Sequence, residues 1–366
     1  MKNKLVFKIF FYLIIGILII IIITLLVLFC YPGVGKIPNK NERNKYSELD
    51  YYSNNKFHNL EDTTLMTGKQ NEGGNSIKPN KTIKAIKWDS YENDGEFTIN
   101  WLGHSSLLIQ MSYQNILIDP VLTNYASPFN FVGVKRFSEV SINPENIPDI
   151  DILLISHDHY DHLDYQTIKK IDSKVKNYIV PLGVDSYLLS FGVDKEKIHT
   201  LKWWENITIN DMDYTLTPSR HYSGRNPLYS NATLWGGYYF TNKENSIYYT
   251  GDSGYTETFK EINKNCGDVD VLLADTGQYN NAWSSIHMNP YEALKTANDV
   301  NAKYYIPVHI GTFALSNHNW YDPLEITTEN KSEYNVNLIT PKIGEKVYYK
   351  NINNYSSEWW KEYLNK

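Results

Sequence analysis

The longest hydrophobic stretch of the chain lies at its amino-terminal end. The run Ile9 to Phe29 contains no charged side chain. As a helix rising about 1.5 Å per residue, it is about 30 Å long, which matches the hydrocarbon thickness of a bilayer. It ends in Phe29-Cys30-Tyr31 and so offers no small-residue site for cleavage. Residues 1–31 are therefore predicted to be a short cytoplasmic tail followed by an uncleaved transmembrane signal anchor.

Basic residues flank this run on both sides: Lys2, Lys4 and Lys8 before it, and Lys36, Lys40, Arg43 and Lys45 after it. The positive-inside rule compares the two flanks, so it gives only a small bias here. That bias favours an amino terminus in the cytoplasm. We therefore expect a single-pass membrane protein with its large domain outside the cytoplasm, and keep the cytoplasmic face as the alternative.

The hydrophobic pattern changes twice after the anchor. Residues 32–81 are rich in Asn, Lys, Ser and Gly, which predicts a polar linker with at most one short helix. From Phe97 onward, apolar runs of strand length alternate with helical patterns. Residues 82–366 are therefore predicted to form one globular domain, since single α/β domains reach this size.

The predicted elements of this domain fall into two clusters. The first has strands at 97–101, 106–111, 116–119, 151–156 and 178–181, with helices at 165–171 and 184–190. The second has strands at 198–202, 207–209, 214–218, 237–241, 247–250, 269–274 and 304–308, with helices at 256–263 and 290–300. Pro290 suits the first turn of the last helix, with Asn289 as its N-cap. Clusters of strands alternating with helices predict an α/β fold of two packed sheets with helices outside.

Composition then excludes several kinds of site and partner. The two cysteines, Cys30 and Cys266, lie far apart, which excludes a disulfide framework and a zinc finger. Any metal must therefore be bound by histidine and carboxylate. The formal net charge of -6 argues against a nucleic-acid partner, which needs a basic face. The sequence also lacks the GxxxxGK[ST] loop of nucleotide-binding proteins and the GxSxG elbow of serine hydrolases.

The motif His157-Asp158-His159-Tyr160-Asp161-His162 directly follows the apolar strand at 151–156. Side chains two positions apart in an extended segment face the same way, so His157 and His159 can reach one cation together. Asp161 and His162 lie past the bend and can face a neighbouring position. Imidazole and carboxylate ligands suit Zn²⁺. A polar surface loop is the alternative interpretation of this motif.

Three further candidate ligands occupy equivalent positions later in the chain. His221, Asp252 and His309 each follow an apolar strand, where loops gather into a site. Taken singly, each would more often be an ordinary histidine or a turn aspartate. As a set they supply the ligands that the first motif alone lacks for two metal sites.

This ligand set resembles that of the metallo-β-lactamase fold superfamily. Over about residues 97–320, the chain also resembles the family of N-acylphosphatidylethanolamine-hydrolysing phospholipase D, in the segments WLGHSSLLI, LIDP, SHDHYDHLD, SRHYSGR, LWGGYYF, YTGDSGY, HMNPYEAL and HIGTFALS. The resemblance implies an αβ/βα four-layer sandwich with a metal site at one edge of its sheets. It also implies two zinc ions per chain. One would be held by His157, His159 and His221, the other by Asp161, His162 and His309, and Asp252 would bridge both.

Two further residues receive expected roles. His287 precedes a helix amino terminus, a location that favours anions, and matches a histidine of the family. Contact with phosphate, or protonation of the leaving group, would make it catalytic together with Asp161 and Asp252; a surface histidine is the alternative. Asp119 ends a strand and is expected to accept a ring N–H from a ligand histidine. A turn carboxylate before Pro120 is the alternative.

The function implied is a zinc-dependent, membrane-anchored phosphodiesterase of the phospholipase D type. Its substrate would be N-acylphosphatidylethanolamine or a related glycerophospholipid, cleaved to phosphatidic acid and N-acylethanolamine. The expected partners are the phospholipid and the membrane, with a homodimer implied by the resemblance. The alternatives are a lactonase or small phosphodiesterase acting on a soluble substrate, and a membrane-tethered binding module without catalysis.

Overall fold

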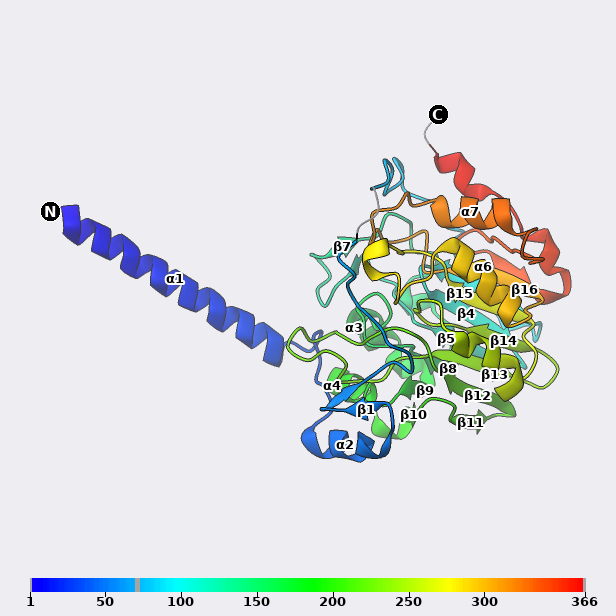
Figure 1. Cartoon of the computed structure of the whole chain (residues 1–366), viewed down its shortest axis with the longest axis horizontal. Coiled ribbons are helices and arrows are strands. Elements are labelled where there is room, and N and C mark those ends of the chain that lie inside the picture. The colour runs from blue at the N-terminus through cyan, green and yellow to red at the C-terminus, as the bar shows by residue number, and fades with distance from the viewer. Residues whose placement is uncertain (1, 70–72, 365–366) are drawn as a thin grey trace.

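The computed structural model describes residues 2–69 and 73–364. Helix α1 (Lys2–Cys30) projects alone from a globular body (Figure 1). Within it, Lys4–Val27 is long and apolar enough to cross a membrane, and none of this stretch is buried in protein. A signal sequence at this position would have the same length and composition, so the helix is a candidate span.

The first of two mixed sheets has seven strands in the order β10 (Ile198–Leu201), β9 (Val175–Pro181), β8 (Ile150–Leu154), β5 (Gln114–Ile118), β4 (Ser106–Met111), β3 (Thr98–Gly103) and β17 (Lys346–Tyr348). The strands from β10 to β5 are parallel, and those from β5 to β17 are antiparallel. The parallel half carries the predicted metal-binding motif, which follows β8.

The second sheet has six strands in the order β11 (Asn206–Ile209), β12 (Met212–Thr217), β13 (Gly237–Thr241), β14 (Ser246–Tyr249), β15 (Val271–Asp275) and β16 (Tyr304–Val308). Its first four strands are antiparallel, and β14, β15 and β16 run parallel. The carboxyl ends of β12, β14 and β16 carry the three later candidate ligands.

Side-chain alternation along the strands separates the layers. In β4, Leu107 and Ile109 belong to the core between the sheets, whereas Leu108 packs with the cluster under α3 (Tyr165–Ile171) and α4 (Asp185–Phe191). Each such side chain contributes about 1.5–3 kcal/mol by leaving water.

In β14 of the second sheet, Ile247 and Tyr249 face the central core and Tyr248 faces the opposite way. It joins the cluster under α5 (Ile262–Asn265) and α6 (Pro290–Asp299). The layers are therefore helix, sheet, sheet and helix, and the predicted α/β architecture is confirmed.

Every predicted strand is present, with ends shifted by a few residues. The helix predicted at 256–263 is present in two parts, a 3-10 helix, Glu257–Glu261, and the single-turn α5 that follows it. Helix α6 begins at Pro290 as predicted, with the Asn289 side chain accepting two backbone N–H groups. The sequence missed the edge strand β17, the hairpin of β6 (Tyr125–Ala126) and β7 (Val134–Lys135), and α7 (Asp322–Asn330). The three strands among them have only two or three residues, too few to show periodicity.

The polar segment predicted as a linker packs against the globular body. It contains α2 (Lys40–Lys45) and a hairpin of β1 (Tyr52–Ser53) and β2 (Lys56–Phe57). Tyr52 and Phe57 are buried in the central core. From Asn59 to Thr67 the chain then crosses the sheet edge that carries the candidate site. We call residues 59–67 the strap.

Candidate metal centre

The predicted residues meet at one edge of the two sheets. The motif from His157 to His162 follows β8, and His221, Asp252 and His309 follow β12, β14 and β16. Parallel strands and their packed partners bring these carboxyl ends together. Side chains separated by as many as 152 positions in the sequence therefore approach within a few ångströms, and all seven predicted ligands belong to one assembly.

The first cluster contains His157, His159, His221 and Asp252, with one ligand atom of each within 4.8 Å of the others. The Nε2 atoms of His157 and His221 lie 3.8 and 3.9 Å from Asp252 Oδ2. His159 Nδ1 lies 3.3 Å from His221 Nε2. These are the residues that the resemblance gives to one cation and its bridge.

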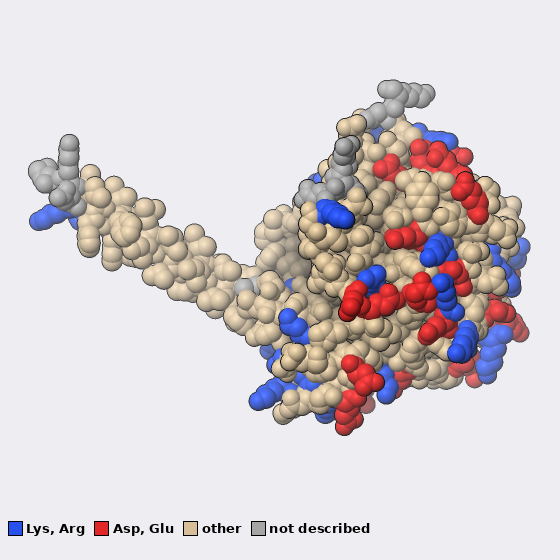
Figure 2. All heavy atoms as spheres, in the orientation of Figure 1, with Lys and Arg blue, Asp and Glu red and all other residues tan. Residues whose placement is uncertain are grey.

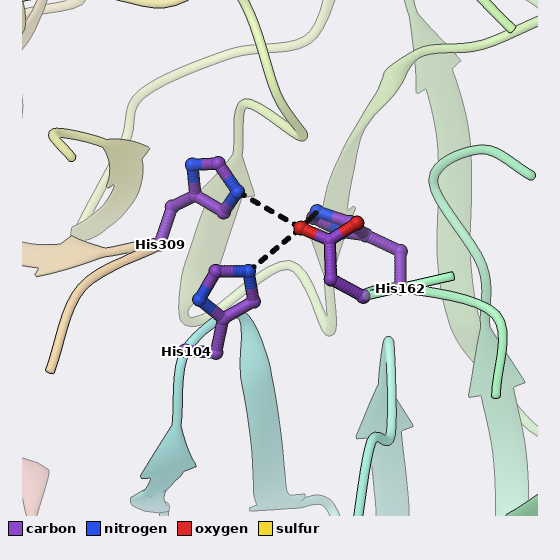
Figure 3. Close-up of side chains that lie close together, drawn as sticks. His104, His162 and His309 are labelled. Carbon is purple, nitrogen blue, oxygen red and sulfur yellow. Dashed lines mark hydrogen bonds and ion pairs between the residues drawn. The ribbon is translucent and has the colours of Figure 1, made fainter. Parts of the chain in front are cut away.

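The second cluster contains Asp161, His162 and His309, joined by His104. Figure 3 shows the rings of His104, His162 and His309 converging on one carboxylate. Asp252 Oδ2 lies 3.1 Å from His162 Nε2 and 3.3 Å from His309 Nε2. Asp252 thus faces both clusters, the position expected of a bridging ligand.

The donor set fits divalent cations. In the described part of the chain, buried His157 Nε2, His162 Nε2 and Asp252 Oδ1 have no hydrogen-bond partner. Unpaired buried polar atoms are costly, so a concentration of them in one place calls for a ligand. Imidazole nitrogens and carboxylate oxygens without sulfur are typical of zinc and related divalent metals.

Buried partners fix the ring orientations. The His221 Nδ1–H donates to the carbonyl oxygen of Ile286, 3.0 Å away. His162 Nδ1 lies 2.8 Å from Asp119 Oδ2, and His309 Nδ1 lies 3.1 Å from Asp275 Oδ1. A proton held on Nδ1 leaves the Nε2 lone pair directed into the cluster, as metal binding requires.

The electrostatics of the two clusters differ. Burial, the largest influence, lowers the pKa of His157 and His221 well below the ordinary value, so these rings stay neutral. Burial also lowers the pKa of His309, but Asp252 and Asp275 outweigh it and raise the pKa to about 10, so a cation bound at Nε2 would have to displace a proton from this ring. Burial raises the pKa of Asp252, yet His162 and His309 hold it well below its usual range. The carboxylates therefore stay ionised and attract positive charge.

Asp119 has the surroundings expected of it. Besides His162, it accepts the Ser156 backbone N–H at 2.8 Å, the Ser156 hydroxyl at 2.5 Å and the Tyr249 hydroxyl at 2.7 Å. The carboxylate is fully buried. It therefore connects the end of β5 with the loop after β8 and with a side chain of the second sheet.

Two residues that contact the predicted ligands, Asp275 and His104, were not predicted to belong to the site. Asp275 bonds to His309 and, through Oδ2 at 2.8 Å, to His287 Nδ1. It ends the apolar strand β15 just as Asp119 follows β5, so the same sequence signal could have identified it. His104 lies 2.8 Å from Asp161 Oδ2 through Nε2. Its turn between β3 and β4 carries no ligand motif, and sequence reasoning had no comparable signal.

The backbone at this edge adopts unusual conformations. His104, Asp119 and His309 have φ angles of 53°, 40° and 63°, in the left-handed region that favours glycine. Two backbone hydrogen bonds connect the β3–β4 turn to the segment after β16: His309 N donates to His104 O, and His104 N donates to Ile310 O. These contacts hold turns of different sheets in register at the site.

A pocket of about 340 Å³ opens beside the clusters. His159, Asp161, Asp252 and His309 form its polar floor, and its remaining lining residues are Met66, Tyr222, Gln278, Trp283, Ile286, His287 and Leu315. His287 is half-buried and stacks 5.0 Å from the His309 ring. The structure thus places His287 at the pocket, next to the predicted ligands. Apolar walls around a few converging polar groups are typical of a ligand site.

The strap forms one side of this pocket. Asn59 Nδ2 donates to the carbonyl oxygen of His221 at 2.8 Å, and the His221 N–H donates back to Asn59 Oδ1 at 3.0 Å. At the other end, Thr67 N donates to Ala282 O at 2.6 Å. Between them Met66 reaches the pocket. A segment of polar composition therefore positions a predicted ligand.

Arg225 connects the metal-binding motif to the segment that follows α1. Its buried guanidinium donates to the carbonyl oxygens of Leu163 and Asp158 on one side, at 2.6 and 3.2 Å. On the other side it donates to Gly33 O and Val34 O, at 2.6 and 3.1 Å. Each of these carbonyl groups belongs to a loop, so one side chain fixes both loops relative to each other.

Comparison with known proteins agrees with this geometry. The model of a family described as "Beta-lactamase superfamily domain" matches residues 114–310. A protein of Mycobacterium tuberculosis strain H37Rv described as uncharacterized is 34% identical over 275 residues, or 74% of each chain. An N-acyl-phosphatidylethanolamine-hydrolyzing phospholipase D 1 of Caenorhabditis elegans is 29% identical over 281 residues, 72% of this chain and 79% of that protein.

Solved structures show the same fold at low identity. Igni18, a metallo hydrolase of Ignicoccus hospitalis, has a TM-score of 0.54 at 18% identity and covers 69% of this chain and 97% of its own. An isothiocyanate hydrolase from Delia radicum gut bacteria has a TM-score of 0.54 at 19% identity. The match covers 68% of this chain and 98% of the hydrolase. By the family model, which matches more than half of its length, this chain belongs to the β-lactamase superfamily, whose fold holds a metal-dependent hydrolase site.

Proposed function

We propose that this protein is a membrane-anchored, di-zinc phosphodiesterase of the phospholipase D type. It cleaves N-acylphosphatidylethanolamine or a related glycerophospholipid to phosphatidic acid and N-acylethanolamine. The observation that carries the proposal is Asp252, whose Oδ2 faces histidines of both ligand clusters at the floor of an open pocket. Similarity to the Caenorhabditis elegans phospholipase D supports the choice of substrate class.

The residues of the site have different roles in this proposal. His157, His159 and His221 would hold one cation, Asp161, His162 and His309 would hold the other, and Asp252 would serve both. When bound, a pair of divalent cations would supply the activation of a water molecule and the stabilisation of charge on the phosphoryl oxygens. Asp119 and Asp275 keep His162 and His309 in the tautomer that exposes Nε2 to the cluster.

His287 supplies the leaving-group chemistry. Its Nδ1–H donates to Asp275 Oδ2 at 2.8 Å, so Nε2 is free to face the substrate. In its doubly protonated form the ring gives the Nε2 proton to the ethanolamine oxygen as the bond between phosphorus and that oxygen breaks, and the proton lost by the attacking water restores the ring. The oxygen of the attacking water remains on phosphorus in phosphatidic acid. The apolar pocket walls, Trp283, Ile286 and Leu315, suit the hydrocarbon part of such a substrate.

Helix α1 keeps the enzyme at its lipid substrate. Its exposed apolar length suits a single membrane span. We place the globular body outside the cytoplasm, following the small positive-inside bias. The homodimer implied by the family resemblance is part of the same proposal.

Metal analysis and two substrate classes test the proposal. The full chain in lipid nanodiscs is expected to contain two zinc ions and to release N-acylethanolamine from N-acylphosphatidylethanolamine. A fully folded chain that binds no divalent metal rejects the enzyme. Turnover of lactones or soluble bis-aryl phosphodiesters without lipid turnover rejects the lipid substrate and favours the soluble-substrate hydrolase.

A further inference from the structure

Two loops of the globular body contact the segment that leaves α1. In the first, the Phe129 ring stacks on Tyr31 with centroids 4.8 Å apart, and Phe131 follows at 5.5 Å from Phe129. Tyr31 is the first residue after the helix. The turn between β6 and β7 is therefore fixed beside the end of α1 by an aromatic contact.

The second loop follows Arg225. Because the Arg225 guanidinium bonds to Gly33 O and Val34 O, residues 226–229 also lie beside the base of the helix. Figure 1 shows both loops, near residues 130 and 228, projecting on the side from which α1 leaves the body. Two segments almost a hundred positions apart in the sequence thus flank the same helix end.

Both loops expose apolar side chains at their tips. Phe131 is 72% exposed and Val132 51%, while Leu228 is 53% and Tyr229 39% exposed. We call these four residues the collar. A single exposed apolar residue is ordinary, but four around one helix base form a patch whose exposure to water needs a reason.

The exposed charged side chains of the segments around the collar are basic, although the chain as a whole is acidic. Three of the segments that meet there, 30–41, 120–138 and 214–243, contain no Asp or Glu, and Asp164, just before α3 and near Tyr31, is buried. They do contain exposed Lys36, Lys40 and Lys135. In the view of Figure 2, acidic side chains lie on the part of the body away from α1. Apolar tips with basic neighbours complement an anionic lipid surface.

We propose that the collar docks on the lipid surface beside α1, in the interfacial layer of the same membrane leaflet. This rests on the proposed function, since it requires α1 to span the membrane. With Cys30 at the end of the span, Tyr31 lies at the headgroup level where aromatic residues gather. The stacked Phe129 holds Phe131 within the same layer. Helix and collar together give three attachments, which fix the tilt of the body and the direction of the pocket relative to the lipid.

Site-specific fluorescence in nanodiscs tests this contact. Single-cysteine full chains carry an environment-sensitive label at F131C or L228C, with Cys30→Ser and Cys266→Ser, in nanodiscs containing anionic lipid. Brominated acyl chains are expected to quench both labels several-fold more than a label at Y113C. Tyr113 is the matched control, since it is 78% exposed in the β4–β5 turn, at the strand ends opposite the site. All three positions are exposed; Phe131 and Tyr113 each lose one surface contact, with Phe129 and with Gly95, and the buried core stays intact.

A label on native Cys30, which is exposed at the end of α1, reports the anchor separately. Quenching at Cys30 with positions 131 and 228 quenched no more than 113 overturns the collar and leaves the anchored enzyme standing. Absence of quenching at Cys30 overturns the anchor and the collar with it. Equal quenching at 113, 131 and 228 also overturns the collar, because the body would then lie on the lipid without a preferred face.

Discussion

The metal-binding edge and the segment between α1 and the globular body lie against each other but are built differently. The predicted ligands sit at strand ends, and the sheets determine their positions. Residues 32–69 instead follow the surface, held by a few buried side chains and by bonds to backbone carbonyl groups. The difference shows that a site can be assembled by the fold and still depend on a peripheral segment for its final geometry.

The largest effect expected is that of Asp252→Asn. A neutral amide cannot balance both clusters, so metal content should fall and turnover should drop by about three orders of magnitude, equivalent to about 4 kcal/mol. Metal analysis and single-turnover assays of the full chain measure this. Asp213→Asn, on β12 where the side chain accepts from the Thr208 hydroxyl, is the matched control. Normal metal content in Asp252→Asn would show that this carboxylate does not bridge.

Truncation tests whether the peripheral segment is part of the domain. A chain starting at Thr82 loses the buried side chains of Tyr52 and Phe57, each contributing about 1.5–3 kcal/mol. It also loses the bonds of Asn59 to His221. Its thermal unfolding should begin many degrees below that of a chain starting at Tyr31. Equal unfolding temperatures would mean that residues 32–81 are a passive linker after all.

Two variants, Asp119→Asn and Asp275→Asn, test the carboxylates that orient candidate ligand histidines. The sequence predicted this role for Asp119 and not for Asp275. Each accepts an Nδ1–H from a ligand histidine, and loss of such a partner typically weakens metal binding about 10–100-fold. Competition with a chelator gives the affinity of each variant. Similar losses in both are expected. A change in only one would show that the two clusters do not depend equally on these carboxylates.

Asn59→Ala probes the contact between the two regions. The variant leaves the backbone N–H and carbonyl of His221 without their partner, at a cost of about 1–3 kcal/mol. We expect kcat to fall several-fold with KM nearly unchanged, because His221 is displaced and Met66 still lines the pocket. Asn44→Ala, exposed in α2, is the control. Unchanged kcat in Asn59→Ala would make the strap a structural cover only.

The smallest effect concerns Cys266, which belongs to neither region. Burial raises its pKa to about 12, and the thiolate is the reactive form, so alkylation of the folded chain at pH 8 should be much slower than in denaturant. Mass spectrometry after timed iodoacetamide treatment measures the rate. Slow reaction leaves exposed Cys30 as the site where a label reports on the helix base. Fast alkylation of Cys266 would contradict the burial of its thiol.

The seven predicted ligand residues lie together at one edge of the sheets, and there is a physical reason why the sequence could indicate them. Metal ligands must be particular residue types, and strand ends can be recognised from apolar runs, so His157 to His162, His221, Asp252 and His309 could all be named. Asp275 carried the same signal as Asp119 and was overlooked. Asn59 and Arg225 were beyond prediction because their main partners are backbone groups, which every residue has. Polar composition likewise concealed that Tyr52 and Phe57 reach the core.

The left-handed backbone at His104, Asp119 and His309 has a consequence for how these turns respond to substitution. Each such residue costs of order 1–3 kcal/mol that glycine would avoid. Replacing any of the three by glycine should therefore relax the backbone of its turn while removing a side chain of the candidate site. Stability and function would pull in opposite directions at these positions, as in the trade-off between stability and activity at strained sites.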